Sequence, residues 1–384
     1  MGARIALPGR VGLTEVPAPG WLPDYPPPAA RSVYAAAHVA ARPNGSIDWD
    51  ATIAFREHLW RYGFGVAEAM DTAQRGTGLR YEQARELIAR SAARAIELGM
   101  PIVSGAGTDQ LPPGRHALAT IAGAYAQQLR HVQEQGSDVI IMASRALAAS
   151  ARPAADYLEV YEQVLTLAHR PVLLHWLGEA FDPALRGYWG SEDITAAADT
   201  VIELIERAGG LVRGVKLSVL DKDIELAMRR RLPPGVRLYT GDDYHYAELI
   251  RGDAHGHSDA LLGAFAAITA PAAAALRALD AGDVGGYDAA MGPTVALSRQ
   301  IFAPPAYDYK AGVAFLAWLN GLQPHFAMLD GLQSRRSPEH LIRVFELAAR
   351  AGALLDPDLA VGRMTSYLAE SAQAVCNSAG TATA

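Results

Sequence analysis

The chain has 384 residues and a net charge of -7; half of its residues are hydrophobic and a fifth are charged. This composition is typical of a soluble globular protein, and no basic block is present that would bind nucleic acid. No apolar run is long enough to span a membrane, and the first residues lack the apolar core of a signal peptide. Cys376 is the only cysteine, which excludes an intrachain disulfide and a cysteine-rich metal site. We therefore expect a cytoplasmic protein with neither a nucleic-acid nor a membrane partner.

Residues 1–31 are rich in Pro and Gly, and two short strands at 4–7 and 11–16 predict an N-terminal hairpin arm. From Ser32 the pattern becomes regular. Short apolar runs, most of them followed by a helical pattern, lie at 32–40, 63–69, 101–107, 137–143, 171–176, 212–218, 236–241 and 258–263. They predict a single (β/α)8 barrel over residues 32–264. An open doubly wound sheet is the alternative, for which Gly105-Ala106-Gly107 is only a weak phosphate-binding motif.

Helix ends and the C-terminal region complete the predicted organisation. Asp48 is expected to cap a helix that ends at Gly63, and Asp193 to cap a helix that stops at Gly209-Gly210. Beyond the barrel, helical patterns at 264–281, 286–302, 308–321 and 338–352 predict a helical extension over residues 265–370. Residues 371–384 are small and polar, so we expect them to fray.

Lysine is scarce, since only Lys216, Lys222 and Lys310 among 34 basic residues are lysines. Lys216 lies in the mostly apolar, β-branched run 212–220, which predicts a buried strand. Unlike Arg, a buried Lys can lose its proton and attack a carbonyl carbon. The pattern is therefore typical of a Schiff-base lysine. The structural alternative is a buried Lys that pairs with a carboxylate or extends its ammonium to water.

In a barrel, the carboxyl ends of the strands form the active site. Polar or ionisable residues follow nearly every predicted strand, which favours an enzyme over a binding module. The candidates in chain order are Glu68, Asp71, Thr108, Ser144, Arg145, His175, Lys216, Ser218, Asp242, Asp243 and His257.

His175 follows an apolar run and lies one predicted strand before Lys216. Because neighbouring strand ends are neighbours in space, this position favours an acid–base role over that of a core histidine. Of Asp242 and Asp243, one is expected to cap a turn or helix, and the other to orient a lysine or bind a hydroxyl.

Imidazole and carboxylate side chains could also bind a divalent metal. The candidate ligands are His175, Glu179, Asp242, His255 and His257. Neither an HxxxH nor an HExxH spacing is present, and a solvated polar loop is the other interpretation of His255 and His257. We therefore predict no cofactor and retain a divalent metal as the alternative.

Five motifs occur in an order that matches a known superfamily. They are Gly45-Ser46-Ile47-Asp48, Gly105-Ala106-Gly107-Thr108, Pro171-Val172-Leu173-Leu174-His175, Gly214-Val215-Lys216 and Gly241-Asp242-Asp243. With them the chain resembles the dihydrodipicolinate synthase and N-acetylneuraminate lyase superfamily of class I aldolases, and more closely its branch of unknown function, DUF993. The resemblance runs from about Ser32 to about Gly331. It implies a Schiff base on Lys216 and a homodimer or homotetramer.

The chain also departs from that superfamily's pattern. His175 replaces the catalytic tyrosine, and Ala143-Ser144-Arg145 replaces a Pro-Tyr-Tyr region. Glu68 and Asp71 replace a neutral segment that binds a substrate carboxylate. Two acidic side chains would repel a carboxylate. We therefore expect pyruvate to bind poorly, and a keto-sugar or polyol-derived ketone, whose hydroxyls donate to carboxylates, to bind better.

Together these observations predict a lyase of the aldolase or dehydratase type that acts on a small carbonyl compound through an imine on Lys216. His175 would move a proton near neutral pH, where imidazole titrates. Glu68, Asp71 and Arg145 would position substrate oxygens. The alternatives are a metal-dependent sugar isomerase or epimerase on the same barrel, and a barrel that only binds a ligand.

Overall fold

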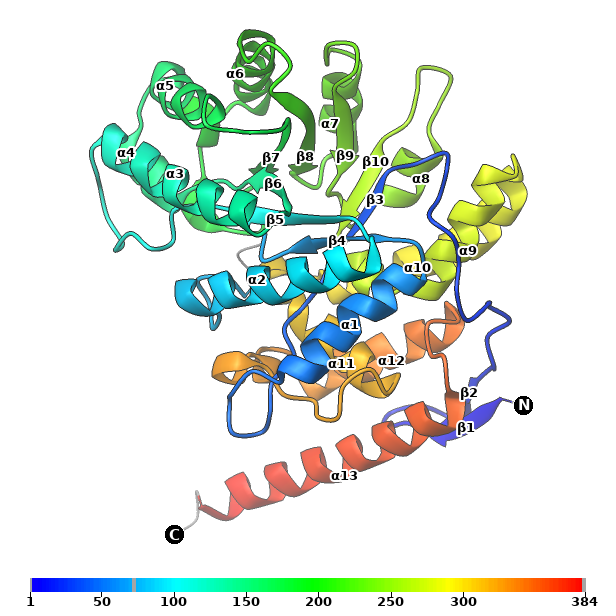
Figure 1. Cartoon of the computed structure of the whole chain (residues 1–384). Coiled ribbons are helices and arrows are strands. Elements are labelled where there is room, and N and C mark those ends of the chain that lie inside the picture. The colour runs from blue at the N-terminus through cyan, green and yellow to red at the C-terminus, as the bar shows by residue number, and fades with distance from the viewer. Residues whose placement is uncertain (1, 71–73, 382–384) are drawn as a thin grey trace.

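The computed structural model describes residues 2–70 and 74–381, and its centre is a closed parallel barrel (Figure 1). Among these residues the barrel strands follow the order β10-β3-β4-β5-β6-β7-β8-β9 around the ring. Each strand falls inside one of the apolar runs predicted from the sequence or extends beyond it by one residue. The barrel prediction is therefore confirmed. The strand bounds are β3 Val33–Ala36, β4 Gly65–Glu68, β5 Ile102–Ala106, β6 Asp138–Ile141, β7 Val172–Leu177, β8 Val212–Ser218, β9 Arg237–Thr240 and β10 Asp259–Leu262.

Helices connect successive strands and form the outer layer of the barrel (Figure 1). Their bounds are α1 Trp49–Arg61, α2 Tyr81–Leu98, α3 Leu118–Glu134, α4 Arg145–Ser150, α5 Ala154–Leu165, α6 Ile194–Arg207, α7 Lys222–Arg229 and α8 Tyr246–Arg251. This alternation of strand and helix allows every strand to pair in parallel with its neighbours.

Two predicted helix caps are confirmed. The backbone N–H of Ala51 donates to Oδ1 of Asp48 at 3.1 Å, and α1 is followed by Gly63 with a φ of 78°. Asp193 accepts the N–H of Thr195 at 2.8 Å at the start of α6. Both carboxylates satisfy backbone donors that a first helical turn leaves unpaired.

The barrel strands are buried on both faces, as the all-buried strands β4, β5, β7 and β10 show. An apolar cluster fills the space inside the ring. Its members are Tyr34, Ala36, Ala67, Met70, Val103, Ile140, Leu173, Tyr239 and Leu261. Since side chains alternate between the two faces of a strand, a strand residue two positions after a member of this cluster also points inward, nearer the carboxyl end, as His175 does after Leu173.

The N-terminal arm forms the expected hairpin, in which β1 Ala3–Ala6 pairs antiparallel with β2 Leu13–Val16. Figure 1 shows this hairpin beside the last helix, α13. Nε1 of Trp21 donates to the carbonyl oxygen of Gly352 at 2.7 Å and so ties the arm to the C-terminal region.

Among residues 2–70 and 74–381, five α-helices follow the barrel, and a short 3-10 helix at Ala264–Ala266 leads into them. They are α9 Thr269–Asp280, α10 Val284–Ile301, α11 Lys310–Leu319, α12 Pro338–Arg350 and α13 Pro357–Thr381. Residues 371–381, which we expected to fray, continue α13 as far as Thr381. This stretch contains no Pro and several Ala, and its one glycine, Gly380, lies next to the last residue of the helix. In the described part of the chain, no helix is long and apolar enough to cross a membrane.

Candidate active site

Lys216 lies on β8 and points into the barrel near the carboxyl ends of the strands. It follows the inward-facing Gly214 by two residues, and it pairs in register with His175 of β7 and Tyr239 of β9. Its side chain is 5% exposed, and its Nζ lies 3.8 Å from Sδ of Met70, just beyond β4. The structure therefore places this lysine at the end of the barrel where active sites form.

His175 shares this interior layer with Lys216. Its Nε2 lies 3.3 Å from the hydroxyl of Ser218, while its buried Nδ1 has no hydrogen-bond partner among the described residues. Burial, followed by the nearby charge of Lys216, lowers the pKa of His175 well below 6.5. The expectation that this imidazole titrates near neutral pH is therefore wrong: it is neutral at physiological pH mainly because burial disfavours its charged form.

Asp242 and Asp243 have separate roles. Asp242 accepts the N–H groups of Tyr244 and His245 at 2.8 and 3.0 Å, and its Oδ2 lies 2.8 Å from Nδ1 of His245. It therefore holds the turn after β9. Oδ1 of Asp243 accepts the N–H of Ala264 at 2.9 Å. Burial raises the pKa of Asp243 to about 7, while the Ala264 N–H and Lys216 act in the opposite direction. The charge of Lys216 therefore acts on the Asp243 carboxyl group.

Gly241 allows β9 to approach Lys216 closely. A Cβ atom at this position would lie 2.9 Å from Cε of Lys216 and 2.8 Å from the carbonyl oxygen of Leu217, and it would collide with the hydroxyl of Ser218. Contacts this short do not occur for real Cβ atoms, so only glycine fits without movement of β8 or β9.

Glu68 does not belong to this layer, which corrects the sequence prediction. Ala67 belongs to the interior cluster, so Glu68, the next residue of β4, points outward. There it accepts two hydrogen bonds from Arg56 of α1 at 2.8 and 2.9 Å, and both side chains are fully buried. Glu68 therefore joins α1 to the barrel wall. Asp71, the other predicted acidic residue, lies outside the described residues.

Thr108, Ser144 and Arg145 follow β5 and β6 as predicted, but they mainly contact protein groups. The hydroxyls of Thr108 and Ser144 lie 2.6 Å apart, and Ser144 caps α4 by accepting the N–H of Leu147 at 3.0 Å. Nε of Arg145 donates to Asp182 at 2.7 Å, and about half of the arginine side chain is exposed. Of the three, Arg145 alone is open to a ligand.

His257 lies at the opposite end of the barrel, which corrects its assignment to the site. It is exposed and precedes β10, and the strands of a parallel barrel all begin at the same end. His255 is in the same exposed segment, and Glu179 is an exposed residue beyond the end of β7. Within residues 2–70 and 74–381, no group of three or more His, Cys, Asp or Glu side chains could hold a metal ion.

Lys310 and Arg75 were not predicted to lie at this end of the barrel. Nζ of Lys310 donates to the carbonyl oxygens of Ala36 and Ala37, just where β3 ends. Arg75 donates to the carbonyl oxygens of Ala69 and Gly105 at 2.8 Å and holds the loop after β4 against β5. The scarcity of lysine that singled out Lys216 would have indicated Lys310 equally well.

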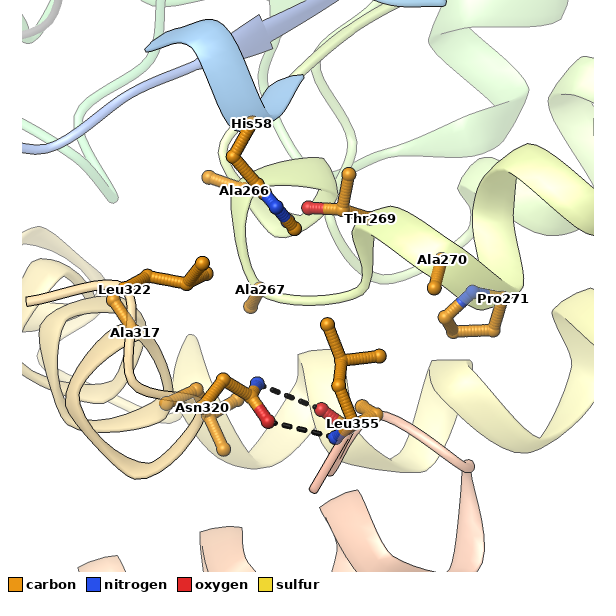
Figure 2. A pocket seen from close by; sticks show the side chains of 12 residues that line it. His58, Ala266, Ala267, Thr269, Ala270, Pro271, Ala317, Asn320, Leu322 and Leu355 are labelled. Carbon is orange, nitrogen blue, oxygen red and sulfur yellow. Dashed lines mark hydrogen bonds between the residues drawn. The ribbon is translucent and has the colours of Figure 1, made fainter. Parts of the chain in front are cut away.

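In the described part of the chain, a small hollow and a larger cleft lie away from Lys216. The one in Figure 2 is bordered by His58, Thr269 and Asn320 and offers about 10 Å³, room for about one water molecule. Both polar atoms of the Asn320 amide form a hydrogen bond there: Nδ2 donates to the carbonyl oxygen of Ala353, and Oδ1 accepts the N–H of Leu355 (Figure 2). A larger cleft of about 340 Å³ has a different lining, which includes Trp176, Gly178, Glu179, Arg186 and Val219. Neither hollow is lined by Lys216 or His175.

The fold and this geometry define a class: a (β/α)8 barrel with a buried lysine at the carboxyl end of its sixth barrel strand. Within that class the chain belongs to the family described as "Protein of unknown function (DUF993)", whose model matches residues 13–372. The family predicted from the sequence motifs is therefore confirmed. No curated protein matches the chain.

Solved structures of dihydrodipicolinate synthases have a similar fold. The enzyme from Aquifex aeolicus is 16% identical with a TM-score of 0.65, over 85% of this chain and 99% of its own. The enzyme from Acinetobacter baumannii, solved with pyruvate, is also 16% identical with a TM-score of 0.63, over 85% and 100%. YagE, a prophage protein of that family from E. coli, also solved with pyruvate, is 17% identical with a TM-score of 0.63, over 83% and 96%. At these identities the likeness concerns the fold.

Proposed function

We propose that this protein is a lyase of the class I aldolase type, which cleaves or forms a carbon–carbon bond, or removes water, through an imine on Lys216. One observation carries the proposal: a lysine in a lysine-poor chain is buried inside the barrel near the carboxyl ends of its strands. The likeness in fold to structures solved with pyruvate supports it. The imine itself needs no metal or organic cofactor.

In this mechanism the neutral amine of Lys216 attacks the carbonyl carbon, and the carbonyl oxygen leaves as water. The imine then accepts the electron pair of the adjacent bond when that bond breaks, which stabilises the developing carbanion. A buried amine suits this task because a low-dielectric environment disfavours the ammonium form, which cannot attack.

His175 would act as the base of the bond-breaking step. A neutral imidazole has one nitrogen that can accept a proton, and the pKa shift keeps His175 in that form. Its buried Nδ1 has no hydrogen-bond partner among the described residues. A substrate hydroxyl could take that place and lose its proton as the carbon–carbon bond breaks. Ser218, at 3.3 Å from Nε2, would orient the ring.

The finer proposal for the substrate is a keto-sugar or a polyol-derived ketone. Two carboxylates, Glu68 and Asp71, were expected to repel a keto acid, but Glu68 is paired with Arg56 and does not contribute. That preference now depends on Asp71. Pyruvate therefore belongs in the set of test compounds beside a neutral hydroxyketone such as dihydroxyacetone. We further propose that the protein is a cytoplasmic homodimer or homotetramer.

Borohydride trapping tests the proposal. The protein is incubated with dihydroxyacetone or with pyruvate, reduced with borohydride, and analysed by mass spectrometry of the intact protein and of its peptides. We expect one covalent adduct on Lys216 that is lost in Lys216→Arg and Lys216→Met. Lys222→Met is the matched control, since Lys222 is half exposed and bound to Glu248. The absence of any adduct with every carbonyl compound tried, or an adduct that persists in Lys216→Arg, would refute the imine mechanism.

A further inference from the structure

Met70 places a thioether beside the amine of Lys216. It follows the last residue of β4 by two positions, its side chain is 1% exposed, and its Sδ lies 3.8 Å from Nζ of Lys216. Strands β4 and β8 face each other across the barrel, because four strand pairings separate them in either direction around the ring. The lysine therefore extends across the interior, and Met70 meets its reacting atom from the opposite wall.

The backbone just before Met70 is held in an unfavourable conformation. Ala69 has a φ of 46°, in the left-handed region that a residue with a Cβ atom rarely adopts. Its N–H donates to Oε1 of Glu68 at 3.0 Å, and its carbonyl oxygen accepts from Nη1 of Arg75 at 2.8 Å. Both of these charged side chains are buried. Such a conformation persists only where its surroundings hold it, and it occurs preferentially at functional sites.

Gly105 of β5 lets the segment after β4 approach the barrel wall. A Cβ atom at this position would lie 2.8 Å from Cα of Met70 and 2.6 Å from Sδ of Met142. Because only backbone occupies this side of β5, Met70 packs into the barrel and not above its mouth. It accordingly belongs to the same interior cluster as Ala67 and Val103.

The contact between a thioether and an amine has a chemical consequence. A thioether has no hydrogen to donate and is only a weak acceptor, so it does not replace the water around an anion or a hydroxyl group. It provides an apolar, adaptable surface beside the atom that attacks the carbonyl compound. In the imine the carbonyl carbon is bonded to Nζ of Lys216, so its substituents lie one bond further and within reach of Met70.

We infer that Met70 is a specificity-determining residue of the proposed active site: it contacts an alkyl substituent of the carbonyl carbon that Lys216 attacks. The inference rests on the function proposed above. A carboxylate or hydroxymethyl group against Met70 would lose hydrogen bonds to water and gain no donor from the thioether.

The polar part of the substrate then lies on the other side of the carbonyl carbon. There His175, on the strand beside β8, has a buried nitrogen that bonds to no described residue. The substrate class is therefore a hydroxyketone with an alkyl group on one side of its carbonyl and hydroxyl-bearing carbons on the other.

A pair of ketones tests this inference through a ratio of rates. Hydroxyacetone has a methyl group where dihydroxyacetone has a second hydroxymethyl group. Each is incubated with the protein and borohydride at limiting concentration, and mass spectrometry of the intact protein gives the rate of adduct formation. The intrinsic reactivities cancel when the hydroxyacetone-to-dihydroxyacetone ratio of a variant is divided by that of the wild type.

We expect Met70→Gln, which replaces the thioether by an amide, to lower this ratio about tenfold, since an apolar site discriminates against an added hydroxyl by up to about 100-fold. Met70→Leu keeps an apolar side chain of similar volume and should leave the ratio within about threefold. Met100→Gln is the matched control, because Met100 is partly exposed and precedes β5, at the opposite end of the barrel. An unchanged ratio in Met70→Gln, or an equal decrease in Met100→Gln, would overturn the inference.

Met70→Ala gives a second measurement that does not depend on Met70→Gln. Its shorter side chain leaves space for a longer alkyl group. Trapping of 1-hydroxy-2-butanone relative to hydroxyacetone should therefore rise about tenfold, the discrimination typical of one methylene group. The wild-type ratio in Met70→Ala would contradict a contact with the alkyl group. Circular dichroism checks that each variant is folded.

The same trapping experiment separates this inference from the proposed function. If the wild-type protein traps these ketones on Lys216 but the Met70 variants keep the wild-type ratios, the inference fails while the imine stands. If the wild-type protein traps no carbonyl compound, the proposed function fails and the inference fails with it.

Discussion

The substitution Glu68→Gln distinguishes a structural carboxylate from a substrate-binding one. In the structure both oxygens of Glu68 accept hydrogen bonds from Arg56, and both side chains are 0% exposed. Glutamine keeps the shape of the side chain but removes its charge, which leaves the Arg56 guanidinium buried and without its counter-ion. Removing one partner of a buried ion pair costs about 3–5 kcal/mol of folding free energy.

This cost can be converted into a shift of the melting temperature. At about 2.1 cal/mol/K of unfolding entropy per residue, a chain of 384 residues has about 0.8 kcal/mol/K, so the expected decrease is about 4–6 °C. Urea unfolding and calorimetry measure both quantities. The matched control is Glu86→Gln, which breaks an exposed pair with Arg90 and should change stability by less than about 1 kcal/mol.

Two further measurements make the interpretation of Glu68→Gln decisive. Replacing Arg56 and Glu68 together by methionine should recover most of the lost stability, because no charge is then left unpaired. Borohydride trapping on Lys216 well below the melting temperature should be close to wild type in Glu68→Gln. If the variant instead keeps its stability within about 1 kcal/mol and loses affinity for the carbonyl compound, the carboxylate binds substrate and the structural argument is wrong.

Three other predictions follow from the structure. Gly241→Ala should slow borohydride trapping on Lys216 by about tenfold or more, because the new Cβ would lie 2.9 Å from Cε of Lys216. Mass spectrometry of the intact protein measures the rate at which the adduct forms. A wild-type rate would contradict the close approach of Gly241 to Lys216. Burial raises the pKa of Glu225 to about 8, so the folded state binds more protons than the unfolded state above pH 4.5, and this carboxyl group makes stability fall as pH rises. Urea unfolding should therefore show that the free energy of unfolding of Glu225→Gln, relative to that of the wild type, rises by about 3 kcal/mol between pH 5 and 8. A difference between the two proteins that stays constant over this range would show that Glu225 titrates normally. Light scattering at micromolar concentration should return a dimer or tetramer mass, and a value near 40.8 kDa would show a monomer.

Much of the fold is determined by local sequence patterns. Each barrel strand is a short apolar run, and each such run can be recognised without knowledge of its neighbours. The helix starts at Asp48 and Asp193 likewise depend on a side chain that bonds to the backbone two or three residues away. The scarcity of lysine indicated a special role for Lys216, and the order of the strands predicted that Lys216 and His175 lie on neighbouring strands, as they do.

The tertiary structure decided which side chains face the site. Strand β4 is buried on both faces, so polar and apolar residues do not alternate along it. Its sequence therefore does not show that Ala67 faces the barrel interior and Glu68 faces outward. The partner of Glu68 comes from α1, and Lys310 reaches β3 from a helix more than 270 residues further along the chain. Asp242 and Asp243 are adjacent in sequence, and only the bonds to His245 and Ala264 separate their roles. Such contacts depend on where distant elements pack, because the charge and burial of a group are set by its neighbours in space and not by its neighbours in sequence.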